Sequence, residues 1–572
     1  MMRTFVDEIA AHAAADPGRV ALTTSDADTT YGELADRIDA AARLLRAAGA
    51  GPERVCAVAV ERGPDAVVAM AAVLRAGAAF LTLDVEQPPA RLAALVRSGG
   101  AELLLAAEPE LVARLGLPIP GPTVLLPREA STPPRPSGPS EIPGPSATAA
   151  GPGHADPAEP CAPPGASLPA QPPAPIRSGT SQAASGPSVA APRRAHTDPA
   201  VPFADAEAAV RVEPSGLAYV SHTSGTTGEP SAVLVEHGGL DNYLRFVVRD
   251  YGLGPDTVAL QVAPLGYDAS IRDTFAPLLA GGRLVLLPRG DVLRPESFGA
   301  AVRRHGVNTL LSVTPSFLSH LAGRPDATEL LDGVGLVVSS GESLRPYLTA
   351  GGRALVRGRL VNQYGPTECT MTSTRYAVPA EPATEADIVG TPLDGVVVRL
   401  LDESLVPVRH GRTGEVYIGG AGVARGYRDR PGRTAERFVP DPLGPPGARL
   451  YRTGDLARLG PEGLSYLGRG DRQIKIRGYR VDPAEIEGAL LSHDAVTGAV
   501  VISDTDAQGR VFLVAHVTGE LDGTSDPALR LHLARTLPPH LMPRRFVRLT
   551  TLPTTRGGKT DRTALAQTGA AR

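Results

Sequence analysis

The run Leu217-Ala-Tyr-Val-Ser-His-Thr-Ser-Gly-Thr-Thr-Gly228 decides how this sequence is interpreted, because a strand-like apolar segment leads directly into a polar loop. The loop, residues 223–228, consists only of hydroxyl-bearing residues and glycines. Backbone N–H groups and hydroxyls in such a loop can surround a polyphosphate, and glycine permits the tight conformation that this requires. The loop is not a P-loop of the GxxxxGK[ST] form, since no Gly-Lys-Ser/Thr follows it. A plain surface turn has the same composition, so the rest of the chain must decide between the two interpretations.

Strand-like and helix-like patterns alternate on both sides of this run. Before it, helical spacing of apolar residues at 31–48 and 66–76 alternates with short apolar runs at 55–60 and 79–83. This alternation predicts parallel strands covered by helices, an α/β layer. After the run, a helix is predicted at 295–305, and further strand-like segments occur at 258–262, 283–287, 309–313, 335–338 and 414–418.

Two segments differ from this pattern. Residues 131–200 contain 18 prolines among Gly, Ala and Ser, and such a composition has little to bury. We therefore expect 128–205 to be a disordered insertion in a large N-terminal domain, 1–470. Residues 471–572 are predicted to form a small α+β domain, with helices at 483–492 and 527–536 and strands at 497–502, 511–517 and 546–549.

Composition and charge exclude several classes of protein. The apolar fraction of 42% and the charged fraction of 21% are typical of globular proteins. With 57 basic and 61 acidic residues the net charge is −4, which gives no electrostatic reason to expect a nucleic-acid or membrane partner. Three widely spaced cysteines, Cys56, Cys161 and Cys369, argue against a disulfide scaffold or a zinc site. Residues 1–20 look like an amphipathic helix, not a signal peptide, and a cytoplasmic protein is the default expectation.

Several motifs, taken in order, link the hydroxyl-rich loop to a known family. The chain resembles the adenylate-forming superfamily, and most closely a stand-alone amino acid adenylation domain of nonribosomal peptide synthetases (NRPS). Besides 217–228, the stretches that carry the resemblance are Tyr267-Asp-Ala-Ser270, Asn362-Gln-Tyr-Gly-Pro-Thr-Glu368, Gly414-Glu-Val-Tyr-Ile-Gly-Gly420, Val423-Ala-Arg-Gly-Tyr427, Arg437-Phe438, Tyr451-Arg-Thr-Gly-Asp-Leu456, Gly468-Arg-Gly-Asp-Arg-Gln-Ile-Lys-Ile-Arg-Gly478 and Leu552-Pro-Thr-Thr-Arg-Gly-Gly-Lys559.

The resemblance implies both a fold and a reaction. The fold is a large N-terminal α/β domain with parallel-rich sheets layered with helices, followed by a small, mobile α+β C-terminal domain. The reaction uses ATP and Mg²⁺ to activate an amino acid as its acyl-AMP with release of pyrophosphate. A phosphopantetheine thiol on a separate carrier protein then accepts the acyl group, in nonribosomal peptide or secondary-metabolite biosynthesis.

The resemblance also implies roles for individual residues. Glu368 would hold Mg²⁺, and Asp455 would accept both ribose hydroxyls. Tyr364 would lie against adenine, and Lys559 would place its ammonium between the substrate carboxylate and the α-phosphate. A hinge at Asp471 would let the small domain swing, so that the Lys475 to Gly478 loop replaces Lys559 at the site. Arg469 would either steady the nucleotide or form a salt bridge at the hinge. The phosphates would be bound by Thr223, Ser224, Gly225, Thr226, Thr227, Gly228 and Thr367.

The substrate pocket can be aligned by motif in the same way. Asp268 would pair with the ammonium of an amino acid, and Arg272 is unusual because a buried guanidinium needs an anion. That anion is either a carboxylate on the substrate side chain or Asp273, with Arg272 then turned away from the pocket. The aligned pocket residues favour a polar substrate and are Asp268, Ala269, Arg272, Ser312, Val338, Ser340, Gln363, Met371 and Thr372.

Two departures from the family pattern leave alternatives open. The family usually has Pro-Lys-Gly after the phosphate loop, whereas this chain has Pro230-Ser-Ala232, and we expect weakened phosphate binding from the missing charge. No Gly-Gly-x-Ser carrier site follows Lys559, so the thiol would come from a carrier protein in trans or from coenzyme A. An acyl-CoA ligase is therefore the second interpretation, and a non-catalytic partner protein is the third. Whether a small MbtH-like activator is needed stays open.

Overall fold

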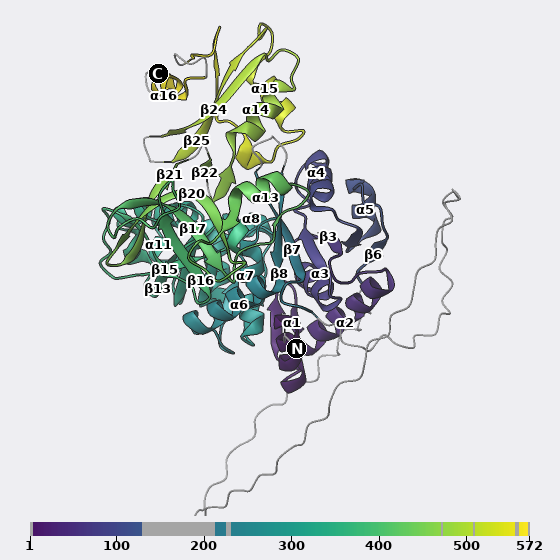
Figure 1. Cartoon of the computed structure of the whole chain (residues 1–572). Coiled ribbons are helices and arrows are strands. Elements are labelled where there is room, and N and C mark those ends of the chain that lie inside the picture. Colours follow the sequence, from purple (N-terminus) through teal and green to yellow (C-terminus); the bar gives the residue numbers. More distant parts are fainter. Residues whose placement is uncertain are drawn as a thin grey trace, which may run out of the picture. The chain divides into compact units, whose positions relative to one another are not determined.

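A computed structural model describes residues 4–127, 212–224, 230–470, 473–476, 478–506, 510–554 and 560–569 (Figure 1). The insertion predicted at 128–205 lies outside the described residues. Within them, no helix is both long and apolar enough to cross a membrane.

The strand-like segment predicted at 216–220, before the hydroxyl-rich loop, lies in a seven-stranded sheet whose central pairs are parallel. β4 pairs in parallel with β3 and β7, and β3 with β5, as the alternating strand and helix pattern predicts. β7 then pairs antiparallel with β8, so the hydroxyl-rich loop connects two neighbouring strands. In spatial order the strands are β18 (Gly426–Tyr427), β8 (Ser231–Glu236), β7 (Leu217–Thr223), β4 (Ala79–Thr82), β3 (Val55–Ala59), β5 (Leu103–Ala106) and β6 (Thr123–Leu125).

A second, 14-stranded sheet has a parallel half and an antiparallel half. β9 to β13 pair in parallel, whereas the strands from β14 to β21 pair antiparallel. In spatial order the strands are β16 (Val396–Leu401), β17 (Thr413–Gly420), β20 (Arg449–Gly460), β21 (Gly463–Arg469), β15 (Asp387–Pro392), β14 (Thr374–Val378), β13 (Arg359–Tyr364), β12 (Leu336–Ser340), β11 (Thr309–Val313), β9 (Val258–Leu260), β10 (Arg283–Val285), β1 (Val20–Thr23) and β2 (Asp28–Thr30), with β19 (Phe438–Pro440) beside β20.

Local sequence signals account for several of the helices that pack on these sheets. α2 begins with a capping box, in which Thr30 and Glu33 exchange side-chain and backbone hydrogen bonds. α9 spans the residues predicted for it and ends at Gly306, whose φ of 64° favours glycine. The helices of this part are α1 (Phe5–Ala15), α2 (Tyr31–Ala47), α3 (Pro64–Arg75), α4 (Pro89–Gly99), α5 (Pro109–Leu115), α6 (His237–Tyr251), α7 (Ala269–Leu279), α8 (Arg289–Leu293), α9 (Pro295–His305), α10 (Pro315–Ala322), α11 (Ala327–Leu330), α12 (Arg345–Thr349) and α13 (Pro431–Arg437).

The C-terminal part is a smaller α+β unit, as the sequence predicts. Its three-stranded sheet has the order β24-β25-β26, with one antiparallel and one parallel pair, and a separate two-stranded hairpin precedes it. The elements are β22 (Ile474–Ile476), β23 (Tyr479–Val481), α14 (Pro483–Leu491), β24 (Gly498–Thr505), β25 (Val511–Thr518), α15 (Asp526–Leu533), β26 (Arg545–Arg548) and α16 (Arg562–Gly569).

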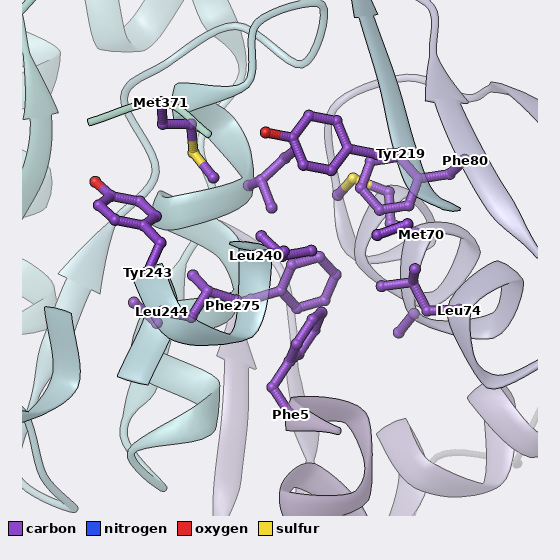
Figure 2. Packing of buried hydrophobic residues seen from close by; sticks show 14 of the residues in the cluster. Phe5, Met70, Leu74, Phe80, Tyr219, Leu240, Tyr243, Leu244, Phe275 and Met371 are labelled. Carbon is purple, nitrogen blue, oxygen red and sulfur yellow. The ribbon is translucent and has the colours of Figure 1, made fainter. Parts of the chain in front are cut away.

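A continuous hydrophobic core anchors helix α7, which carries the predicted pocket residues. Phe275 of α7 lies at the centre of this core beside Phe5, with 4.8 Å between their ring centroids (Figure 2). Phe80 and Tyr219 stack on the side of the seven-stranded sheet, and Tyr243 of α6 belongs to the same cluster. Phe275 is fully buried and packs α7 into this core.

Candidate active site

The first turn of α7 presents one anion and one cation on the same face. Asp268 precedes the helix and Arg272 follows four residues later, a spacing that brings two side chains together on a helix surface. Oδ2 of Asp268 is buried and has no hydrogen-bond partner among the described residues. Burial raises the pKa of Asp268, although a hydrogen bond from Thr367 and the charge of Arg272 oppose this shift. This acidic group is therefore suited to a cationic partner.

Arg272 is 1% exposed, and all its hydrogen-bond partners are neutral. It donates to Ser312 Oγ at 2.8 and 3.0 Å, to the Tyr243 hydroxyl at 2.8 Å and to Ser340 Oγ at 3.4 Å, and it also contacts Gln363 Oε1. No anion is in hydrogen-bonding contact with this buried guanidinium, so no direct partner neutralises its positive charge.

Asp273 is the intramolecular partner considered for Arg272, but its carboxylate forms hydrogen bonds with backbone groups and not with the guanidinium. Its Oδ2 accepts the backbone N–H groups of Val262 and Ala263, each at 2.9 Å, and it influences Arg272 only through space. The alternative in which Arg272 turns away from the pocket to pair with Asp273 is therefore wrong. Arg272 instead contacts three of the aligned pocket residues, Ser312, Ser340 and Gln363.

The remaining aligned pocket residues complete the wall around Arg272. Thr372 donates to Gln363 Oε1 at 3.2 Å, and Ser312 donates to the carbonyl of Ala269 at 3.0 Å. Val338 is buried in β12, and Met371 is nearly buried in a turn where its φ of 68° lies in the left-handed region. A bulky residue in that region marks a constrained backbone, which is common at binding sites.

Asp455 and Tyr364, the residues expected to bind the nucleoside, are in contact. The Tyr364 hydroxyl donates to Asp455 Oδ2 at 2.6 Å, and Arg469 donates to Oδ1 at 2.7 Å. Arg469 therefore forms a salt bridge, and its partner is Asp455, the residue predicted to bind the ribose. Burial, together with the adjacent Asp455 carboxylate, raises the pKa of Tyr364 far above its ordinary value, so the phenol remains a donor.

Glu368 lies in a fully buried network of donors. Its Oε1 accepts the Tyr427 hydroxyl at 2.7 Å and its Oε2 accepts Arg480 at 2.9 Å. Burial opposes ionisation, but Arg480 and Tyr427 outweigh it and hold the pKa of Glu368 below its ordinary value. The carboxylate already faces a cation, so the position fits positive charge. No group of three or more His, Cys, Asp or Glu residues in the described part of the chain could enclose a metal, and Glu368 stays the predicted ligand for Mg²⁺.

The β22–β23 hairpin brings the predicted Lys475 to Gly478 loop to these residues. The Lys475 ammonium lies 5.5 Å from the Tyr364 ring centroid and 5.3 Å from that of Tyr466. Gly478 has a φ of 84°, and a Cβ there would come within 2.8 Å of Thr314, so this position requires glycine. Arg480, two residues later, makes the contact with Glu368.

The hydroxyl-rich loop is described only at its beginning. Thr223 ends β7 with its hydroxyl buried and without a partner among the described residues, and Ser224 donates to the carbonyl of Arg480 at 3.1 Å. The other predicted residues of this loop, the residue predicted as the hinge and the lysine predicted to be catalytic lie outside the described residues: Gly225, Thr226, Thr227, Gly228, Asp471 and Lys559.

Four residues that contact the predicted ones were not predicted from the sequence. Tyr243 and Tyr251 of α6 bind Arg272 and Gln363 respectively, and Tyr427 and Arg480 bind Glu368. Tyr427 and Arg480 do stand at or just after motif stretches, but nothing in their local pattern identifies the partner. The α6 tyrosines carry no motif signal at all.

Two family models match the chain. A model described as AMP-binding enzyme matches residues 9–428, and one described as AMP-binding enzyme C-terminal domain matches residues 485–559.

Individual proteins agree with these matches. The chain is 36% identical over 568 residues to phosphinothricin tripeptide synthetase PhsB of Streptomyces viridochromogenes, which covers 97% of this chain but only 41% of that protein. Among solved structures, PA1221, an NRPS protein containing adenylation and PCP domains, matches with a TM-score of 0.71 and 27% identity over 98% of this chain and 84% of its own. NpsA-ThdA, an artificially fused adenylation-PCP di-domain NRPS from Klebsiella oxytoca, has the same fold, with a TM-score of 0.74 and 24% identity over 96% of this chain and 95% of its own.

Proposed function

The chain belongs to the AMP-binding enzyme family, and we propose that it activates an α-amino acid with an anionic side chain as its aminoacyl adenylate. The observation that carries this proposal is the pair Asp268 and Arg272 on the first turn of α7. Asp268 has an unpartnered carboxylate oxygen for the substrate ammonium. Arg272 has only neutral hydrogen-bond partners, and the Asp268 and Asp273 carboxylates act on it only through space, so a side-chain carboxylate of the substrate would be its first anion in direct contact.

In the proposed reaction, a carboxylate oxygen of the amino acid attacks the α-phosphorus of ATP. The new bond joins that oxygen to phosphorus, and the bond from phosphorus to the bridging oxygen breaks, so pyrophosphate leaves. Both reactants are anionic, and catalysis must therefore consist mainly of positioning and charge neutralisation. A Mg²⁺ ion held by Glu368 would offset charge on the phosphates.

The chain's own residues have distinct proposed tasks. Asp455 and Tyr364 bind the nucleoside, and their contact of 2.6 Å supports a shared site. Thr367 connects the two halves of the site, because it opposes the rise in the pKa of Asp268 and directly precedes Glu368. Lys559 remains the proposed partner of the α-phosphate and the substrate carboxylate.

We further propose that the adenylate is passed to the phosphopantetheine thiol of a carrier protein. The thiolate would attack the acyl carbon, and AMP would leave with the electrons of the broken carbon–oxygen bond. The contact of the β22–β23 hairpin with Tyr364 and Glu368 supports a role for this hairpin when the phosphates have left. The chain spans about two fifths of the PhsB length, so the carrier and the assembled product are proposals only.

Amino-acid-dependent exchange of labelled pyrophosphate into ATP tests the proposal. The panel would contain aspartate, glutamate, longer acidic homologues, the corresponding amides and neutral amino acids. Exchange with an acidic member best of all would support the proposal, and a Lys559→Ala variant should then lose it. Exchange only with acids that lack an amino group would indicate an acyl-CoA ligase, and no exchange with any acid would indicate a non-catalytic protein.

A further inference from the structure

Ser231, at the position where a lysine was expected, is bonded to an arginine from a distant segment. Ser231 begins β8 and is buried, directly after the hydroxyl-rich loop and Pro230. Its Oγ accepts a hydrogen bond of 2.5 Å from a guanidinium nitrogen of Arg433, which lies in α13. A positive charge is therefore present beside residue 231, although residue 231 itself is neutral.

A second contact ties Arg433 to the acidic residue of the site. Its guanidinium lies over the Tyr427 ring, 4.7 Å from the centroid, at a separation typical of a cation–π interaction. The Tyr427 hydroxyl donates to Glu368 at 2.7 Å. Arg433 thus lies between the strand that follows the phosphate loop and the tyrosine that positions Glu368.

The two contacts leave Arg433 able to bind an anion. Both partners, a serine hydroxyl and a phenol ring, are neutral, so neither offsets the charge of the guanidinium. Arginine carries five N–H donors in a planar fork that matches phosphate oxygens, and the contact with Ser231 uses one of its nitrogens. The side chain is half-buried, which strengthens a contact with phosphate relative to one in open solvent.

We propose that Arg433 binds the terminal phosphates of ATP and supplies the charge that Ser231 does not. This inference rests on the proposed function, since it assumes that ATP occupies the site. The absence of a lysine at position 231 should then not weaken phosphate binding, because Arg433 provides the positive charge instead.

Calorimetric titration of the full-length chain with ATP, inorganic pyrophosphate and AMP, each with Mg²⁺, tests the proposal. In Arg433→Gln the dissociation constants of ATP and pyrophosphate should rise about ten- to a hundredfold, the loss expected for a charged hydrogen bond. That of AMP, which lacks the terminal phosphates, should stay unchanged. Arg357→Gln is the matched control, because it removes an exposed arginine that pairs with Asp332. The double variant Ser231→Lys with Arg433→Gln should recover ATP affinity.

Other outcomes would overturn the inference. Unchanged ATP affinity in Arg433→Gln would show that the arginine does not reach the phosphates. An equal loss for AMP and ATP without rescue by Ser231→Lys would show that it only fastens α13 to β8. These titrations need no amino acid, so ATP binding without exchange would reject the proposed function alone. A wild-type chain that binds no ATP would reject both.

Discussion

Replacing Arg272 by glutamine should change which amino acid the site accepts. The guanidinium now donates to Ser312, Tyr243, Ser340 and Gln363 and has no anionic contact of its own. Removing one partner of a buried, hydrogen-bonded charge pair costs about 2–5 kcal/mol. At 1.36 kcal/mol for each factor of ten, a central value of about 3 kcal/mol corresponds to roughly 150-fold in kcat/KM for an acidic substrate.

The side chain of glutamine retains an amide donor but carries no charge. The amide analogue of the best substrate should therefore lose far less than the acid, and the ratio of kcat/KM values for acid and amide should fall by about two orders of magnitude. Pyrophosphate exchange across matched pairs, aspartate with asparagine and glutamate with glutamine, measures this ratio. KM for ATP should not change, because Arg272 contacts none of the residues assigned to the nucleotide.

A graded control separates substrate recognition from packing. Ser340→Ala removes the longest of these contacts, at 3.4 Å, and should alter the acid-to-amide ratio only slightly. Thermal unfolding of each variant reports any loss of stability from the partners left unbonded. An equal fall of kcat/KM for acids, amides and neutral amino acids would refute the reasoning, since Arg272 would then only support the pocket wall.

Three further predictions concern other groups. Asp268→Asn should lower exchange with every α-amino acid by about ten- to a hundredfold, because the ammonium loses a charged partner; unchanged KM values would contradict this. Glu368→Gln should lower exchange about a hundredfold with the same preference order among amino acids, and chelation of Mg²⁺ should abolish wild-type exchange. Burial lowers the pKa of His237 to about 4, below its ordinary value of 6.5. Between pH 6.5 and 4 only the unfolded chain gains this proton, so His237 alone should contribute a fall of about 3 kcal/mol in the free energy of unfolding as the pH drops. Urea denaturation at several pH values measures this change, and the free energy of unfolding should fall less in the His237→Gln variant than in the wild type.

Local patterns predicted elements well and long-range contacts poorly. The helix at 295–305 and the strands at 309–313 and 511–517 were found because apolar spacing and glycine stops are local signals. The pairing of β1 with β10, more than 250 residues apart, has no such signal. The order of the 14-stranded sheet therefore could not be predicted.

The same distinction holds for the site. Motifs identified Asp268, Glu368 and Asp455, but their neighbours come from elements distant in the sequence. Tyr243 and Arg433 became visible only through contacts across the fold. For Arg272, chemistry alone left two partners open, and the direction of the side chain excluded one of them.

The bond between Arg480 and Glu368 couples two events that are usually considered apart. Arg480 places a positive charge on Glu368, the residue proposed to hold Mg²⁺, and two cations at one carboxylate repel each other, so docking of the β22–β23 hairpin and metal binding should oppose one another. Thermodynamic reciprocity requires that each weakens the other by the same factor. The supply of magnesium nucleotide would thus set the fraction of molecules with a docked hairpin, without a separate regulatory site.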